Sequence, residues 1–415
     1  MTARSTRPDV IIIGAGMIGL AVAWRAGRQG MRVTVFERED AGSGTSRVAA
    51  GMLAPVSEVE FGEAGARMLE LGLRSAALWP AFASELEAAS GQPVGLLRTG
   101  TLLVARDADE ARALERQLAF RGSLGLRAVR VRPSQARELE PALAPTIRLA
   151  LELPDDHSVD PRLVLAALRS ACLASGVELR ERSSVAGVLT GADGAISGVE
   201  LRGGERVPAP AVVIAAGTWS NELRGLPADG RIPVRPVKGQ TLRLRDPAGP
   251  GLLRRAVRFE EGYLVPRADG RYVLGGTMEE RGFDQAPTAG AAYELLRDCH
   301  DLIPGVSELE IEELCVGLRP GTPDNLPAIG AGAIAGLVWA TGHFRNGILL
   351  APLTAELVIG LLGATRPPDR LLETCAPSRF GGALRRSEHA RAPAARANDP
   401  AATRKNGARA AAGLW

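Results

Sequence analysis

The chain has 415 residues, of which 46% are hydrophobic and 23% charged, and this length is enough for two domains with a sizeable buried core. Such a composition excludes a short disulfide-stapled module, a collagen-like fibre and a fully disordered chain. The net charge of +3 is concentrated near the C-terminus: residues 376–415 carry eight Arg or Lys and two acids, so the preceding 375 residues carry a net charge of −3. With an aromatic content of only 4%, this balance predicts no nucleic-acid partner.

The four cysteines, Cys172, Cys299, Cys315 and Cys375, are widely spaced and have no histidine nearby at a metal-ligand spacing. We therefore expect free thiols, no metal site and a reducing, cytoplasmic environment. The sequence has no run of 18 uncharged apolar residues, so no membrane association is expected.

The N-terminal segment predicts a βαβ unit. Residues 9–13 are a short β-branched run, a glycine-rich turn follows, and a helical stretch ends at Gly30. Residues 31–36 form the second strand, which ends at Glu37.

Further elements follow in chain order. Helices are predicted over 63–90, 109–119, 161–175 and 289–302 and from about 347, and strands over 100–105, 177–179, 184–189, 199–201, 212–216 and 337–340. Between 232 and 274, short strands with polar turns indicate an antiparallel sheet in a second domain. Residues 376–415 are rich in Ala, Arg, Pro and Gly without periodicity, which predicts a disordered tail that is dispensable from about Ser378.

Gly14, Gly16 and Gly19 form a GxGxxG motif between the first strand and its helix. Gly14 permits the tight turn, Gly16 lets a pyrophosphate approach the backbone, and Gly19 permits close packing of helix and strand. The helix N-terminus supplies free N–H groups and a positive dipole for phosphates. Glu37 can accept hydrogen bonds from a ribose and disfavours a 2′-phosphate, so NADP is not expected.

Two further segments favour FAD over NAD. Residues 42–52 are small and hydroxyl-rich, and they can surround a long cofactor with backbone N–H groups and hydroxyls. Residues 341–352 repeat the pattern of strand, glycine turn and helix start. A second helix N-terminus aimed at the cofactor would stabilise negative charge on a reduced flavin.

These segments, together with residues 215–220, 236–240 and 317–324, resemble the FAD-dependent amine oxidase family, which includes D-amino-acid oxidase, sarcosine oxidase and glycine oxidase. The resemblance spans roughly residues 9–375 and is strongest to the glycine oxidases. It implies an α/β fold with a Rossmann-like FAD-binding domain and a second, antiparallel-sheet substrate domain. Both domains are discontinuous in the sequence: residues 8–85, 150–222 and 320–375 would bind FAD, and residues 86–149 and 223–319 would form the substrate domain.

The resemblance also implies which residues contact FAD. The cofactor is expected to bind noncovalently, because the position that tethers flavin in some relatives corresponds to Gly317 and not to Cys315. Besides the three motif glycines, the implied FAD contacts are Met17, Ile18, Glu37, Arg38, Thr45, Ser46, Ala50, Gly51, Met52, Val185, His343, Phe344, Arg345, Asn346, Gly347, Ile348 and Leu349.

Arg319, within Gly-Leu-Arg-Pro-Gly-Thr, matches the arginine that holds the substrate carboxylate in this family. A guanidinium presents a planar fork that binds a carboxylate through two hydrogen bonds. Tyr263 is expected to hydrogen-bond the same carboxylate, and Met278 and Arg345 match positions that line the pocket. Where glycine oxidases can carry a histidine two residues before the tyrosine, this chain has Glu261.

The implied reaction transfers hydride from the Cα of glycine, sarcosine or a small D-amino acid to flavin N5. With O₂ as oxidant it gives an imine, then glyoxylate and ammonia, and hydrogen peroxide, and it implies a role in forming the thiazole of thiamine. Two alternatives stay open. One is a D-amino-acid or sarcosine oxidase or dehydrogenase of the same fold; the other is a non-catalytic flavoprotein, which would have no use for a carboxylate-binding arginine. A homo-oligomer is also left open.

Overall fold

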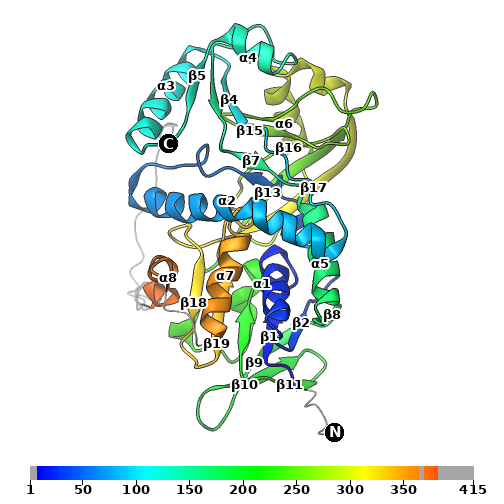
Figure 1. Ribbon diagram of the computed structural model, residues 1–415, viewed down its shortest axis with the longest axis vertical. Helices are drawn as coiled ribbons and strands as arrows, with labels where there is room; N and C mark the ends of the chain where they lie inside the picture. Colours follow the sequence, from blue (N-terminus) through cyan, green and yellow to red (C-terminus); the bar gives the residue numbers. More distant parts are fainter. Residues whose placement is uncertain (1–6, 364–368, 382–415) are drawn as a thin grey trace, which may run out of the picture.

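The computed structural model describes residues 7–363 and 369–381. The chain folds around two large sheets, which occupy the lower and upper parts of Figure 1. The lower sheet has the strand order β18-β19-β12-β1-β2-β8, in which neighbours from β19 to β8 are parallel and β18 is an antiparallel edge. Its strands are β1 (Val10–Ile13), β2 (Val33–Phe36), β8 (Glu178–Arg180), β12 (Val212–Ile214), β18 (Ala328–Ala331) and β19 (Leu337–Thr341).

The parallel strands read as continuous apolar runs because both faces of the sheet are buried. Val10 and Ile12 of β1 enter a core made with helices, whereas Ile11 and Ile13 enter a core on the opposite face, which includes the small sheet β11-β10-β9. The long helices of the first core are α1 (Met17–Arg28), α2 (Gly62–Ser90), α5 (Pro161–Ala174) and α7 (Ala351–Leu362). The small sheet comprises β9 (Val185–Thr190), β10 (Ile196–Leu201) and β11 (Arg206–Pro208).

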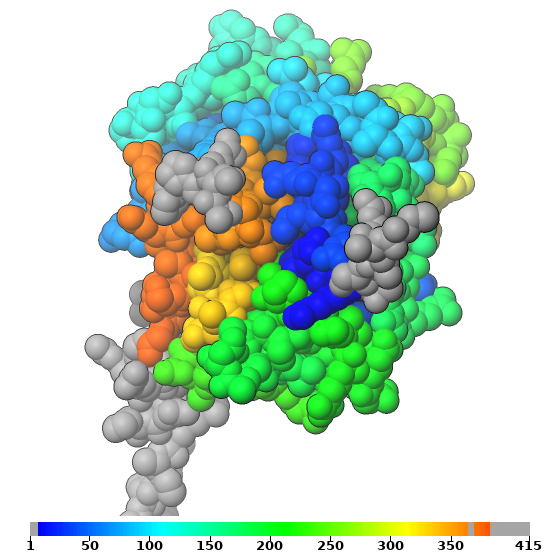
Figure 2. All heavy atoms as spheres, turned by 60° about the horizontal axis from the view of Figure 1, so that its bottom comes forward, coloured from blue at the N-terminus to red at the C-terminus, as the bar shows by residue number. Residues whose placement is uncertain are grey.

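Segments far apart in the sequence share these layers. Figure 2 shows α1, in blue, directly beside α7, in orange, and the two helices pack against each other. The glycine-rich turn after β1 and the turn after β19 therefore lie at the same edge of the sheet, because β1, β12 and β19 run in parallel.

The upper sheet has the order β17-β13-β16-β15-β14-β4-β6-β5, and all its neighbours are antiparallel except β14 and β4. Its strands are β4 (Thr101–Ala105), β5 (Val129–Val131), β6 (Leu149–Leu153), β13 (Arg235–Arg245), β14 (Ala256–Phe259), β15 (Gly262–Pro266), β16 (Arg271–Gly275) and β17 (Glu310–Gly321). Helices α3 (Ala108–Ser123), α4 (Pro133–Leu139) and α6 (Ala289–His300) surround it.

Short elements complete the described chain: β3 (Met52–Leu53), β7 (His157–Ser158), α8 (Leu371–Cys375), and 3-10 turns η1 (Thr45–Arg47), η2 (Gly217–Glu222), η3 (Ala228–Gly230), η4 (Pro304–Glu308) and η5 (Pro377–Phe380). Across residues 7–363 and 369–381, every helix is too short or too polar to cross a bilayer.

The predicted fold class is confirmed, with a Rossmann-like parallel sheet and a separate, mostly antiparallel sheet. The domain limits differ in detail. The expected limit at 149/150 falls inside β6, and the limit at 319/320 falls inside β17, although both strands belong to the upper sheet. We propose to move these limits beyond Leu153 and Gly321, since a strand belongs to the sheet that holds its hydrogen bonds.

The expected disordered tail begins too early in the sequence. Residues 376–381 are ordered. Phe380 is 4% exposed in the core between the lower sheet and the small sheet β11-β10-β9, and Arg379 forms an ion pair with Asp324 at 2.9 Å. The low apolar content of the tail as a whole concealed these two contacts, so the expected disorder is wrong for residues 376–381. We now expect residues 378–381 to contribute to stability. The rest of the expected tail, residues 382–415, lies outside the described residues.

Candidate active site

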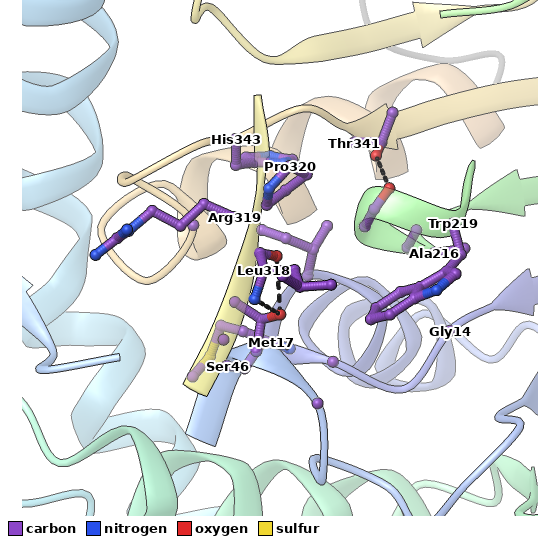
Figure 3. Close-up of a pocket in the computed structure, with 18 of the residues that line it drawn as sticks. Gly14, Met17, Ser46, Ala216, Trp219, Leu318, Arg319, Pro320, Thr341 and His343 are labelled. Atoms are coloured by element: carbon purple, nitrogen blue, oxygen red, sulfur yellow. Dashed lines mark hydrogen bonds between the residues drawn. The ribbon is translucent and has the colours of Figure 1, made fainter. Parts of the chain in front are cut away.

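A cavity of about 610 Å³ lies between the two sheets and is lined from both of them. Its walls come from the turns after β1 and β2, the loop over 42–54, η2, and the turn after β19 on one side, and from β13, β15 and β17 on the other. Figure 3 shows Arg319 and Trp219 on opposite sides of this space. The cavity is of the size that binds organic cofactors and small substrates.

The glycine-rich turn has the geometry expected for phosphate binding. Gly14 has a φ of +102°, and a Cβ there would lie 2.6 Å from the Ala215 carbonyl oxygen, so only glycine fits. A Cβ on Gly16 would meet only Ser46 Oγ, at 3.3 Å, and would project into the space where a pyrophosphate is expected. Gly19 does not line the cavity; a Cβ there would lie 1.8 Å from the Gly14 carbonyl oxygen, which confirms its packing role.

Glu37 lies at the end of β2 and lines the cavity. Its Oε2 accepts a hydrogen bond from the Ala15 N–H at 2.8 Å, and its Oε1 accepts one from the Glu39 N–H at 3.1 Å. Each carboxylate oxygen can accept a second bond, so Glu37 braces the turn and still has capacity for ribose hydroxyls. Beside it, the Arg38 guanidinium stacks on the Trp219 ring at 3.6 Å and closes this end of the cavity.

The hydroxyl-rich loop joins the two halves of the site. Ser46 Oγ accepts a hydrogen bond from the Met17 N–H at 3.0 Å, at the start of α1. Thr45 Oγ1 donates to the Leu318 carbonyl at 2.9 Å and lies 3.2 Å from the Leu318 N–H, next to Arg319 on β17. Met17, Ile18, Thr45, Ser46, Ala50, Gly51 and Met52 all line the cavity, as does Val185 from β9.

The turn after β19 forms another wall. His343 is 2% exposed, and its Nε2 lies 2.9 Å from Thr354 Oγ1; burial lowers the pKa of this imidazole to about 3, which keeps it neutral. Phe344 has a φ of +48°, which bends the chain into the cavity wall. His343, Phe344, Arg345, Asn346, Gly347 and Ile348 line the cavity as expected.

Leu349 does not line the cavity. It is 3% exposed, and its carbonyl accepts hydrogen bonds from Ser75 Oγ at 2.6 Å and Trp79 Nε1 at 2.9 Å of α2. The residue is therefore a link between the turn and α2, and the expected FAD contact is corrected.

Arg319 projects from β17 at the far end of the cavity (Figure 3). Its Nη1 donates to the Thr277 carbonyl at 2.9 Å, and no carboxylate among the described residues forms an ion pair with it. Burial lowers the pKa of this guanidinium from its ordinary value, yet arginine stays charged in proteins. A largely enclosed guanidinium without a carboxylate partner is suited to binding an anion.

Tyr263 stands beside Arg319, and glycines make room for both. A Cβ on Gly276 would lie 3.0 Å from Tyr263 Oη and 3.5 Å from Arg319 Nη2, so the two polar groups flank the same point. A Cβ on Gly239 would lie 2.2 Å from Arg319 Nη1. Burial raises the pKa of the Tyr263 hydroxyl, which therefore remains a neutral donor.

Met278 is not in this group. It is 58% exposed and is absent from the cavity wall, in contrast to the expectation. The cause is the alternation of side chains after β16: Thr277 turns inward, where its Oγ1 donates to Glu279 at 2.7 Å, so the next side chain points outward. Glu261 is also outside the cavity wall and pairs with Arg106 at 2.5 Å.

Sequence reasoning missed Glu58, which lines the cavity near Arg345. Its carboxylate pairs with Arg258 at 3.2 Å and lies 3.9 Å from Arg345 Nε. Asp156 holds the preceding backbone by accepting hydrogen bonds from the N–H groups of Val56 and Ser57. No local pattern marks Glu58, because its partners come from distant parts of the chain.

The cavity fits FAD better than a smaller cofactor. One end, at Glu37 and the glycine-rich turn, is suited to a ribose and phosphates, and the other, at Arg319, is cationic; backbone and hydroxyl groups lie between them. All four cysteines are buried free thiols, and none lines the cavity, so the geometry offers no thiol for tethering a flavin.

Comparisons with known proteins agree with this assignment. The sequence matches the DAO family, described as FAD dependent oxidoreductase, over residues 9–361. It is 35% identical to the glycine oxidase of Geobacillus kaustophilus over 359 residues, which cover 86% of this chain and 93% of that protein. It is 36% identical to the bifunctional protein ThiO/ThiG of Trichormus variabilis over 374 residues, which cover 90% of this chain and 55% of that longer protein. The crystal structure of the Geobacillus kaustophilus glycine oxidase matches with a TM-score of 0.82 at 34% identity, over 90% of this chain and 99% of that one. The chain therefore belongs to the DAO family of FAD dependent oxidoreductases.

Proposed function

We propose that this enzyme oxidises glycine and other small amino acids, such as sarcosine and small D-amino acids, to imines that hydrolyse to oxo acids. The observation that carries the proposal is the Arg319 guanidinium, which faces the cavity without a carboxylate partner among the described residues and lies beside the Tyr263 hydroxyl. This pair suits one carboxylate group. The similarity to glycine oxidases supports the choice of glycine.

Arg319 and Tyr263 would bind the substrate carboxylate, the first by a charge-assisted fork and the second by its neutral hydroxyl. The Thr277 carbonyl fixes Nη1, which leaves the other guanidinium N–H groups for the substrate. When bound, FAD would supply the hydride acceptor for the substrate Cα, and its reoxidation by O₂ would give hydrogen peroxide. The protein accordingly binds and orients the amino acid.

The side chain of the substrate must fit beside Glu58 and Arg345, which also line the cavity. Arg345 is a poor partner for a second carboxylate because it already pairs with Glu60 and lies 3.9 Å from Glu58. The site therefore favours small monocarboxylic amino acids over dicarboxylic ones.

A peroxide-coupled assay of the purified protein tests this proposal. Glycine, sarcosine and D-alanine should be oxidised, whereas methylamine, which lacks a carboxylate, and D-aspartate should be poor substrates. A parallel assay with an artificial electron acceptor distinguishes an oxidase from a dehydrogenase. Turnover of methylamine as fast as glycine would overturn the carboxylate assignment.

We also propose a role in forming the thiazole of thiamine, which rests on the sequence resemblance and on similarity to the ThiO part of a bifunctional protein. Deletion of the gene should then produce a growth requirement that thiamine relieves. Unchanged growth without thiamine would argue against this role.

A further inference from the structure

The hydroxyl-rich loop over residues 42–54 is called the cofactor loop below. The carbonyl groups of its residues 47–51 all accept hydrogen bonds from outside the loop. Arg243 Nη2 donates to the carbonyls of residue 47 at 2.6 Å and residue 49 at 3.3 Å. Thr241 Oγ1 donates to that of residue 48 at 3.4 Å, and Arg267 Nη2 to that of residue 50 at 2.6 Å. The Val159 N–H donates to that of residue 51 at 2.9 Å.

This pattern determines where the N–H groups of the loop point. In a trans peptide the N–H is directed opposite to the carbonyl of the preceding residue. Because the carbonyls of residues 48–50 face the donors from the upper sheet and its loops, the N–H groups of Ala49, Ala50 and Gly51 face the other way. None of these three N–H groups donates to another described residue, and all three residues line the cavity.

The two arginines are unusual for buried residues. Arg243 and Arg267 are each 6% exposed, and the Nε of each has no hydrogen-bond partner. Arg267 lies 3.5 Å from Asp160, but no ion pair is formed by Arg243 within the described residues. Burial lowers the pKa of Arg267 to about 10, which leaves it charged at neutral pH. Such incompletely paired buried charges are costly to a fold, which suggests a role other than stability.

We propose that Arg243 and Arg267 are positioning residues for FAD. They hold the loop carbonyls on its outer side, so that the N–H groups of Ala49, Ala50 and Gly51 are presented as a row of donors to the cofactor. Arg243 lies in β13 and Arg267 directly follows β15, so the substrate domain positions this part of the cofactor site. This role concerns FAD binding and does not depend on which amino acid is the substrate.

The test is the FAD dissociation constant of the apoprotein, measured by fluorescence titration, together with the apoprotein Tm. Arg243→Met and Arg267→Met should each weaken FAD binding about 10-fold or more, because a charged donor to the loop is lost. Their apoprotein Tm should fall less than that of a matched control, Arg255→Met. Arg255 immediately precedes β14 of the upper sheet, and its side chain is 15% exposed; it pairs with Glu140 and Glu152, and it is not in the cavity wall.

The control variant removes the only guanidinium that pairs with the fully buried Glu140 within the described residues, so it should lower the Tm, yet its FAD affinity should match that of the wild type. Arg243→Lys and Arg267→Lys should recover part of the FAD affinity, since an ammonium group can still donate to a loop carbonyl. If a methionine variant fails to fold, the lysine variant is compared with the wild type instead. The proposal is overturned if the lysine variants bind FAD no better than methionine variants that do fold. It is also overturned if Arg255→Met, which lowers the Tm without altering the loop contacts, weakens FAD binding as much as Arg243→Met and Arg267→Met do.

Discussion

His343 shows how a single buried residue at the cavity wall couples stability to pH. Its pKa is about 3 in the folded protein because of burial, against about 6.5 in an unfolded chain. Between these values the unfolded state binds a proton that the native state does not. The free energy of unfolding therefore falls as the pH falls through this window, by up to about 1.4 kcal/mol per pH unit from this residue.

Replacement His343→Gln should remove this contribution, because the amide is neutral at every pH and can still reach Thr354. Urea unfolding at pH 7.5 and 4.5 should show that the wild type loses about 2–3 kcal/mol more than the variant over this range. Comparing the two proteins cancels other titrating groups, such as Asp156, whose pKa burial raises to about 6. An equal loss in both proteins would show that His343 does not titrate in this way.

At the scale of elements, the short C-terminal turn η5 anchors the strand-to-strand connection between β17 and β18. Arg379 pairs with Asp324 and donates to the Leu326 carbonyl at 2.8 Å. Phe380 packs in the core on the face of the lower sheet that the small sheet covers. Asp324 in turn accepts hydrogen bonds from Thr322 and from the Leu326 N–H, just after the strand that carries Arg319. A segment beyond the expected end of the fold thus supports the turn that follows the strand carrying Arg319.

Phe380→Ala should accordingly lower the free energy of unfolding by about 3 kcal/mol, through lost burial and the cavity left behind. Chemical denaturation of the holoprotein measures this change. Tyr293→Ala is a suitable control, since Tyr293 is 65% exposed and its removal should cost less than about 0.5 kcal/mol. A loss at Phe380 no larger than that at Tyr293 would mean that η5 contributes nothing to stability.

Most elements of the parallel sheet could be predicted from the sequence because their signals are local. A β-branched run, a glycine turn and a helix identify β1, α1 and the phosphate-binding turn without knowledge of the rest. Strand β17 could not be identified in this way, since its first residues, 310–312, are charged or exposed and it is held by pairing with β13. Phe380 was missed because one apolar side chain does not stand out in a polar segment.

At the scale of the whole molecule, the site lies where the two sheets meet, and its parts differ in how far they could be predicted. The cofactor end comes from contiguous motifs, and nearly all the expected residues line the cavity there. The substrate end combines strands from the upper sheet with the loop over 54–61. Met278 was therefore misplaced and Glu58 missed, because side-chain direction after a strand and ion pairs between distant segments depend on tertiary structure.

The two sheets also contribute different parts of the site. The lower one supplies the turns at which we propose that FAD binds, and the upper one supplies Arg319, Tyr263 and the arginines that donate hydrogen bonds to the cofactor loop. This division predicts that substrate binding and cofactor binding can be separated by substitution. Loss of Arg319 should strongly weaken recognition of the amino acid while the FAD site remains intact.

Anaerobic reduction of the bound FAD by glycine, followed by its visible absorbance, tests this claim most directly. In the wild type, glycine should bleach the visible absorbance of the bound FAD. Arg319→Ala should retain its FAD, but glycine should reduce that FAD at least about 30-fold less efficiently, since a charge-assisted contact with the carboxylate is lost. Arg319→Lys should recover only part of the rate, and the exposed control Arg245→Ala should behave as the wild type. Reduction of Arg319→Ala by glycine at the wild-type rate would contradict the assignment of this site.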